Sequence, residues 1–277
     1  MPVRVDALAL ARPHSLKAAL SMLAGDPALT PIAGCTDVYV SFQFGTMKQQ
    51  QRFIDLWPLD ELRGITVKGD TLRIGAMTTY SELIASKIVN KRLPMLVAAA
   101  QEVGGAQIQN RGTLGGNIAN ASPAGDTLPV LAAADARVVL RSHRGQRTVP
   151  FESFYTGYRA SVRQPNELIT AIEFPAVGGT QWWRKVGTRR AQAISKVMIA
   201  AVRGAKGAEV RIAFGAVGPT VILARKTASI LQQGGSIADA QAALLTEITP
   251  IDDIRSTRDY RARVAANLLA EFWTGTK

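Results

Sequence analysis

A break in the sequence pattern near residue 177 constrains how this chain can fold more than any other feature. Pro175 and the pair Gly178-Gly179 follow a strand-like segment at 167–174, and beyond them three strand-like segments (181–186, 196–203 and 208–217) precede three helical ones. Proline and paired glycines end regular elements, and strands followed by helices are typical of a separate α+β unit. We therefore expect an α+β protein with one domain at residues 1–177 and a second at 178–277.

The first 177 residues carry signals for both helices and strands. Ser15 can cap a helix that ends at Gly25, and Gly69-Asp70 is a suitable turn for a hairpin of 64–68 and 71–75. Helix-spaced apolar residues mark 93–103, and 136–141 is strand-like. The stretch from about 104 to 130, crowded with Gly, Asn, Ser, Thr and Pro, fits neither pattern.

The metal-binding and nucleophilic side chains are too few for several kinds of chemistry. The single cysteine, Cys35, and two distant histidines, His14 and His143, exclude a zinc site or an iron–sulfur cluster built within the chain. A Cys–His nucleophile pair is formally possible, but neither histidine lies in a recognisable motif. Demanding chemistry would therefore depend on a bound organic cofactor.

The same composition bears on the compartment. One cysteine cannot form an internal disulfide, which suits a reducing environment. No run of about 18 uncharged apolar residues is present, and the first residues do not resemble a secretory leader. We expect a cytoplasmic protein without a membrane span.

The chain is strongly basic, with a formal net charge of +12. Eight cations crowd into one stretch that only Glu209 opposes: Arg184, Lys185, Arg189, Arg190, Lys196, Arg203, Lys206 and Arg211. Such an excess indicates a nucleic acid, an anionic ligand or an acidic partner, although a solvated basic face is the commoner outcome. No nucleic-acid-binding motif accompanies the stretch. The last helical segment adds Arg255, Arg258, Arg261 and Arg263 beside its apolar positions.

Two glycine-centred segments are candidates for nucleotide binding. The first consists of Pro31, Ile32, Ala33, Gly34, Cys35, Thr36, Asp37 and Val38, and the second of Thr113, Leu114, Gly115, Gly116 and Asn117, followed by Asp126. Successive backbone N–H groups in such turns can form a nest for phosphate oxygens, and glycine lets a ligand approach the backbone closely. Each segment alone is also compatible with a structural turn, and neither is a Rossmann fingerprint or a phosphate loop.

Five segments in order carry a more specific signal. They are AGCTD near residue 35, RGTLGGNIANASPAGDTLP from residue 111, KVGTRRAQAISKV at 185–197, IAFGAVGP at 212–219 and DDIRSTRDYR at 252–261. In this combination the chain resembles the FAD-carrying medium subunit of the molybdenum hydroxylases, the family of xanthine dehydrogenase and carbon monoxide dehydrogenase. The resemblance runs from about Arg12 to Phe272.

The resemblance implies a fold and a cofactor. The fold would be a two-part FAD-binding domain of the vanillyl-alcohol-oxidase type, with parts at about 1–60 and 61–177, followed by a small α/β domain with an antiparallel sheet and helices. FAD would be bound non-covalently. Residues 31–38 would wrap its pyrophosphate, Thr113 to Asn117 would form the second FAD-binding stretch, and Asp126 would be the acidic residue beyond it. Ile169 would contact the flavin ring through its backbone, and Lys185 would lie near that ring.

The resemblance also implies partners. A molybdenum-cofactor subunit would act on the organic substrate, a two-cluster iron–sulfur subunit would deliver electrons, and FAD would pass them to NAD or another acceptor. No residue of this chain would be catalytic in the acid–base sense. Two other readings stay open at this point: a stand-alone FAD-dependent oxidase, and a basic nucleic-acid-binding protein.

One departure from the family pattern concerns the first segment. Members of the family usually have a second glycine where Cys35 stands, which gives AGGTD instead of AGCTD. A cysteine side chain there could crowd the pyrophosphate or expose a thiol, and it could equally be a small buried apolar residue.

Overall fold

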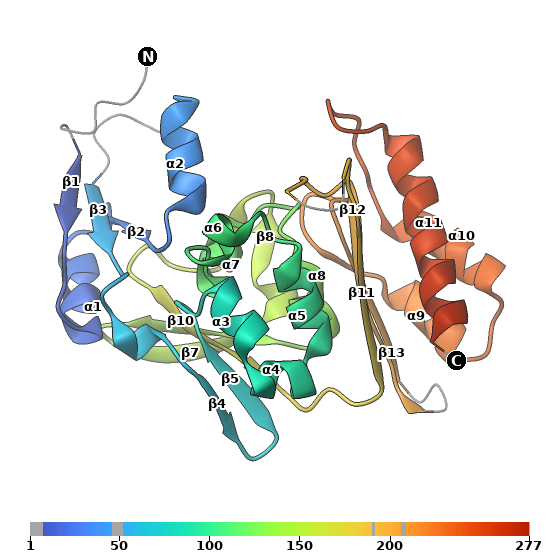
Figure 1. Ribbon diagram of the computed structural model, residues 1–277, viewed down its shortest axis with the longest axis horizontal. Coiled ribbons are helices and arrows are strands. Elements are labelled where there is room, and N and C mark those ends of the chain that lie inside the picture. The colour runs from blue at the N-terminus through green and yellow to red at the C-terminus, as the bar shows by residue number, and fades with distance from the viewer. Residues whose placement is uncertain (1–7, 46–51, 190–191, 206–208, 277) are drawn as a thin grey trace.

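The computed structural model describes residues 8–45, 52–189, 192–205 and 209–276. These residues form three sheets of three or more strands that follow one another across the molecule, each with helices packed on it (Figure 1). Within the part of the chain described, no helix combines the length and the hydropathy that a membrane crossing requires.

A small parallel sheet occupies the N-terminal end of the molecule. Its strands lie in the order β1-β3-β2, and the elements of this part are β1 (Ala9–Ala11), α1 (Leu16–Gly25), β2 (Thr30–Ile32), α2 (Thr36–Gln43) and β3 (Arg52–Asp55). Helix α1 begins as predicted, because the Ser15 hydroxyl accepts a hydrogen bond from the Ala18 N–H at 3.1 Å. Its buried face, Leu16, Ala19, Leu20 and Leu23, packs with Ile54 of β3.

A five-stranded antiparallel sheet forms the centre, with its strands in the order β4-β5-β10-β6-β7. The strands of this sheet are β4 (Ile65–Lys68), β5 (Thr71–Gly75), β6 (Arg137–Ser142), β7 (Gly145–Pro150) and β10 (Leu168–Phe174). The helices of this part are η2 (Asp60–Leu62), α3 (Tyr80–Ala85), α4 (Lys87–Arg92), α5 (Pro94–Gln101), α6 (Ala106–Gln109), α7 (Leu114–Asn120), α8 (Leu128–Ala133) and η3 (Phe151–Ser153), and a short hairpin joins β8 (Tyr155–Gly157) to β9 (Ala160–Ser161). The predicted hairpin of 64–68 and 71–75 is confirmed.

The stretch from 104 to 130 contains three short helices, which corrects the expectation that it is neither helix nor strand. Helix α7 is only seven residues long and contains two glycines, so it carries no apolar periodicity that the sequence could reveal. The Thr113 hydroxyl caps its first turn, and Ala121, in the left-handed region at φ 52°, ends it.

The C-terminal part is a four-stranded antiparallel sheet between two helical layers (Figure 1). Its strands are β11 (Thr180–Val186), β12 (Val197–Arg203), β13 (Val210–Gly215) and β14 (Ile222–Leu223), and its own helices are α9 (Arg225–Gln232), α10 (Ile237–Glu247) and α11 (Arg258–Gly275). The three predicted strands and three predicted helices are therefore present. Ser236 caps α10 as expected, accepting from the Asp239 N–H at 3.1 Å.

Strand β12 explains how the C-terminal sheet joins the rest of the molecule. Alternate residues of a strand point to opposite faces, and every residue from Val197 to Val202 is buried. Ala200 and Val202 pack into the central core below α5 and α8, whereas Ile199 and Ala201 pack against α9–α11. A sheet covered on both faces needs a continuous apolar run, as VMIAAV provides.

One arginine of the last helix, Arg261, is directed into the protein. Arg261 is buried and donates to the carbonyl oxygens of Lys196 and Ala216, each at 2.9 Å, and to Asp253 at 2.8 Å. It ties α11 and the preceding loop to the ends of β12 and β13. A long side chain at the helix start can reach over the sheet edge, which the spacing of apolar residues does not reveal.

Candidate functional site

The two glycine-centred segments meet at one cavity of about 390 Å³. Its walls come from all of residues 30–38, from the start of α7 and from the start of β10. Of the predicted residues, the following line it: Pro31, Ile32, Ala33, Gly34, Cys35, Thr36, Asp37, Val38, Thr113, Gly115, Gly116, Asn117 and Ile169. Leu114 is fully buried beside it, and Asp126 and Lys185 lie outside the lining.

The turn after β2 presents unpaired backbone donors to this cavity. Gly34 packs so tightly on the α6–α7 turn that an added Cβ would lie 1.6 Å from the carbonyl oxygen of Arg111. Cys35 then adopts the left-handed conformation, at φ 62°, and α2 begins without a side-chain cap. Among the described residues, the N–H groups of Thr36, Asp37 and Val38 have no acceptor. A helix start with free N–H groups attracts an anion.

At the start of α7, unlike at the start of α2, the backbone N–H groups already have acceptors. The Gly115 N–H donates to Ala76 O at 2.8 Å, the Gly116 N–H to the Thr113 hydroxyl at 3.0 Å, and the Asn117 N–H to Thr113 O at 3.0 Å. These donors are therefore occupied, and the Thr113 side chain serves as the helix cap. A Cβ at Gly115 would lie 2.6 Å from that of Ala76, so Gly115 is needed for packing against the central sheet.

Gly116 faces the cavity. Apart from the Thr113 hydroxyl, a Cβ added at Gly116 would meet only Ala33, at 4.0 Å across the cavity. Asn117 beside it is oriented by a hydrogen bond of 2.6 Å, in which the Thr127 hydroxyl donates to its side-chain oxygen. Of the two glycines, only Gly116 therefore has open space in front of it, whereas Gly115 is explained by helix–sheet packing.

Strand β10 offers an open backbone edge at Ile169. Strand β5 pairs with β10 only from Ala171 onward, and the register with β6 shifts between Ile169 and Ala171. On the β5 side the pairing ends where the Ala76 N–H donates to Thr170 O, and Ile169 beyond it lines the cavity, where its backbone can meet a ligand. Arg163, which also lines the cavity, holds the preceding loop by donating to Glu167 O at 2.9 Å.

The last two predicted residues pair with each other. Lys185 Nζ lies 2.8 Å from Asp126 Oδ2 and donates to Glu102 O at 3.2 Å, and its side chain is 2% exposed. The Ser195 hydroxyl donates to the other carboxylate oxygen of Asp126. Burial raises the pKa of Asp126, and the lysine charge opposes that rise. This cluster joins the start of β12 to the central domain behind the wall of the cavity.

The cavity also has contributors that the sequence did not indicate. Met77, Tyr80 and Val103 line it, together with Asn120. Burial raises the pKa of the Tyr80 hydroxyl, which therefore stays neutral. Burial likewise raises the pKa of Asp37, on α2. In the sequence, Met77, Tyr80 and Val103 look like ordinary helix and strand positions, and only tertiary packing around α3 and α5 brings them to the cavity.

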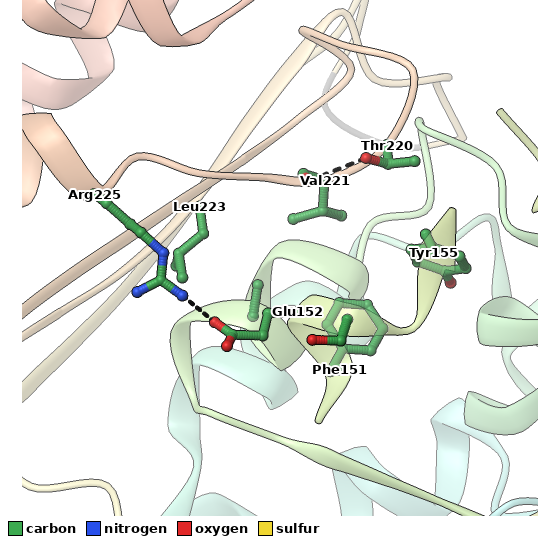
Figure 2. A pocket seen from close by; sticks show the side chains of 9 residues that line it. Phe151, Glu152, Tyr155, Thr220, Val221, Leu223 and Arg225 are labelled. Carbon is green, nitrogen blue, oxygen red and sulfur yellow. Dashed lines mark hydrogen bonds and ion pairs between the residues drawn. The ribbon is translucent and has the colours of Figure 1, made fainter. Parts of the chain in front are cut away.

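A second, smaller cleft of about 310 Å³ lies where the two domains meet. Figure 2 shows Arg225 of the C-terminal domain reaching Glu152 of η3, with Leu223 and Val221 beside them. The guanidinium and the carboxylate form an ion pair between the two domains, so the charges of this cleft are used in the contact between the domains. Within the described residues no group of three or more His, Cys, Asp or Glu side chains could hold a metal ion.

Comparison with known proteins identifies the family of this two-domain chain. Residues 6–177 match the family described as FAD binding domain in molybdopterin dehydrogenase, and residues 182–276 match the carbon monoxide dehydrogenase flavoprotein C-terminal domain. The chain therefore belongs to the FAD-binding medium subunits of the xanthine and carbon monoxide dehydrogenases, as its motifs predicted.

Individual relatives align with most of the chain. The xanthine dehydrogenase FAD-binding subunit of Escherichia coli O157:H7 is 32% identical, over 90% of this chain and 89% of that protein. The carbon monoxide dehydrogenase medium chain of Hydrogenophaga pseudoflava is 35% identical over 80% of each chain. A solved structure of carbon monoxide dehydrogenase from the same organism superposes with a TM-score of 0.91, at 30% identity, over 97% of this chain and 96% of that chain.

Proposed function

We propose that this chain holds FAD in the 390 Å³ cavity and serves as the flavoprotein subunit of a molybdenum hydroxylase. The observation that carries the proposal is the uncapped start of α2, whose free N–H groups open into a cavity bounded on the far side by an open strand edge. A dinucleotide needs both features, because its pyrophosphate requires donors and its flavin ring requires a flat wall with backbone groups.

The residues present fit an FAD molecule. Pro31 to Val38 would hold the pyrophosphate, chiefly through the N–H groups of α2. Gly116 and Asn117 would let the dinucleotide lie against α7, with Thr113 fixing the turn and with Leu114 and Gly115 fixing the helix on the sheet. Ile169 would bind the flavin ring through its backbone. Asp126 and Lys185 would support the wall and the adjoining loop as an ion pair, and we propose no direct contact for them.

Bound FAD would supply the redox chemistry, taking electrons from iron–sulfur clusters of a partner subunit and passing them to NAD or another acceptor. The chain's own contribution is binding, orientation and exclusion of water. Relatives named medium chain or complex subunit support a multi-subunit enzyme. The matched family, named for molybdopterin dehydrogenase, supports a partner subunit that holds the molybdenum cofactor. Residues 186–196, of which 190 and 191 lie outside the described part, would shape access for the acceptor.

The basic stretch gives little support to a nucleic-acid-binding function. Lys185 is buried, Lys196 lies over the Tyr260 ring at 5.1 Å, and Arg203 stacks on Trp273 at 3.7 Å. Arg211 pairs with Glu209 at 3.2 Å. These cations are dispersed through the fold and mostly engaged, whereas phosphate backbones are bound by a continuous basic face. Arg190 and Lys206 lie outside the described residues.

The binding claim is tested by reconstituting the purified chain with FAD. We expect one FAD per chain, released completely into the supernatant by acid, because no covalent bond is proposed. The variant Gly116→Val places a branched side chain at the ligand-facing position and should weaken binding a hundredfold or more, equivalent to about 3–5 kcal/mol. A folded wild-type chain that takes up no FAD would refute the proposal. If Gly116→Val bound FAD as tightly as the wild type, α7 would not be part of the binding site.

The relay claim is tested by reduction of the bound flavin. Co-purified with its partner subunits, the chain should show bleaching of the flavin bands when an aldehyde, a purine or carbon monoxide, whichever the complex oxidises, is added. The isolated chain should show none. Bleaching of the isolated chain would replace the relay with a stand-alone oxidase.

A further inference from the structure

Trp57, just beyond β3, has a guanidinium stacked close to its ring. The Arg111 guanidinium carbon lies 3.6 Å from the ring centroid, and that of Arg63 lies 4.5 Å from the same centroid. The backbone of Trp57 is anchored, because its backbone N–H donates to Asp55 Oδ1 at 2.9 Å. Guanidinium groups stack favourably on tryptophan, so the ring holds Arg111 in place without using its N–H donors.

The two arginines differ in what their donors do. Arg63 donates to the carbonyl oxygens of Met77 and Trp57, each at 3.1 Å, and so joins two segments of the backbone. Within the described chain, no hydrogen bond or ion pair engages the Arg111 guanidinium. Arg111 is therefore an oriented cation whose planar guanidinium has its donors available, and such a group can donate two parallel hydrogen bonds to the oxygens of a phosphate.

Arg111 lies outside the residues that line the cavity, and its backbone contacts the turn at residues 34–38. Its carbonyl oxygen is the atom that an added Cβ at Gly34 would strike. Its charge opposes the rise that burial imposes on the pKa of the Cys35 thiol, so the guanidinium acts on the turn where α2 presents its free N–H groups. Three other cations near the cavity already have partners: Lys185 pairs with Asp126, Arg163 donates to the backbone of residues 164 and 167, and Arg159 donates to Asn120.

We infer that Arg111, held by Trp57, is the cation that neutralises the pyrophosphate of the bound dinucleotide. The inference rests on the proposed FAD site and extends it, because the turn at 34–38 supplies dipoles but no positive side chain. Arg111 would close over the outer side of the pyrophosphate. Trp57 is then a positioning residue, since it contacts the arginine and not the ligand.

The test is FAD affinity of the full-length chain, measured by titration at several sodium chloride concentrations. Arg111→Gln should weaken binding about ten- to a hundredfold at low salt, and its affinity should depend less on salt than that of the wild type. Arg111→Lys, which keeps the charge, should retain most of the salt dependence. Arg144→Gln, at the exposed β6–β7 turn, removes one charge far from the proposed contact and should behave like the wild type.

The role of Trp57 as a positioning residue is tested by replacing the tryptophan. Trp57→Phe keeps a ring face and should bind FAD within a few-fold of the wild type, whereas Trp57→Leu should approach Arg111→Gln, with circular dichroism confirming that each variant is folded. An affinity of Arg111→Gln within twofold of the wild type, or an unchanged salt dependence, would overturn the inference and leave the FAD site standing. A wild-type chain that binds no FAD would overturn the proposed function itself.

Discussion

Replacing Gly34 with alanine is the sharpest test of how this cavity is built. The added Cβ would lie 1.6 Å from Arg111 O and 2.4 Å from the Arg111 carbonyl carbon, both of them backbone atoms that no rotamer change can move away. Restoring an ordinary contact near 3.4 Å requires the turn after β2 and the α6–α7 turn to separate by about 1.8 Å. These two turns contact each other, and both contribute residues to the wall of the cavity.

Two quantities should change together. Overpacking of this kind costs about 1–3 kcal/mol of folding free energy, and the shift should misalign at least two N–H donors at the start of α2. Two lost hydrogen bonds to a charged group correspond to roughly 3 kcal/mol or more, so FAD should bind at least a hundredfold more weakly. Urea denaturation measures the first effect, and titration of the apoprotein with FAD measures the second.

Gly25→Ala is the matched control. Gly25 ends α1 and would place its new Cβ with no atom inside 4 Å, so stability and FAD affinity should stay close to wild type. If Gly34→Ala were folded and bound FAD within threefold of the wild type, the tight contact would have no bearing on the ligand. Our account of the turn as a phosphate cradle would then be refuted.

Three further predictions follow from the site and its supports. Lys185→Met should cost about 3–5 kcal/mol in urea denaturation, because it leaves Asp126 buried without its partner; a loss under 1 kcal/mol would contradict a buried pair. Cys35→Gly should bind FAD at least as tightly as the wild type and gain up to about 1 kcal/mol of stability, because φ 62° suits glycine; weaker binding would mean that the thiol contributes. The hydrogen bonds from Arg147 lower the pKa of Glu167 from its ordinary 4.5, so its carboxylate stabilises the fold above that pH and loses this effect as the pH falls through the folded-state pKa. The melting temperature of Glu167→Gln should therefore fall less steeply than that of the wild type as the pH is lowered. Equal slopes of melting temperature against pH would contradict the claim that protonation of Glu167 destabilises the fold.

The Lys185–Asp126 ion pair joins the two domains. Lys185 stands on β11 of the C-terminal domain, and Asp126 lies just before α8 of the first domain. The loop after β11 is held to the same carboxylate by Ser195. Breaking the pair should therefore loosen that loop as well as destabilise the fold, which hydrogen exchange of residues 186–189 and 192–196 would detect.

Local signals in the sequence determined much of the secondary structure. Ser15 and Ser236 cap helices where the pattern places them, and the 64–75 hairpin follows from its turn residues. The alternation and the apolar run of β12 specify a sheet that is covered on both faces. These features depend on neighbours within a few residues, so they can be read without knowing the fold. The ordered motifs likewise determined the family, because their residue types and order are properties of the chain itself.

The position and the partners of each motif residue depend on the tertiary structure. Gly115 and Gly116 are adjacent in sequence, yet one packs on Ala76 and the other faces the cavity, because α7 turns successive residues about 100° apart. Lys185, a basic residue in a basic stretch, is buried against a carboxylate that lies 59 positions earlier. The spare guanidinium of Arg111 emerges only when Trp57, from another segment, stacks beneath it. Such roles arise from contacts between segments far apart in the chain, and short-range patterns carry no record of those contacts.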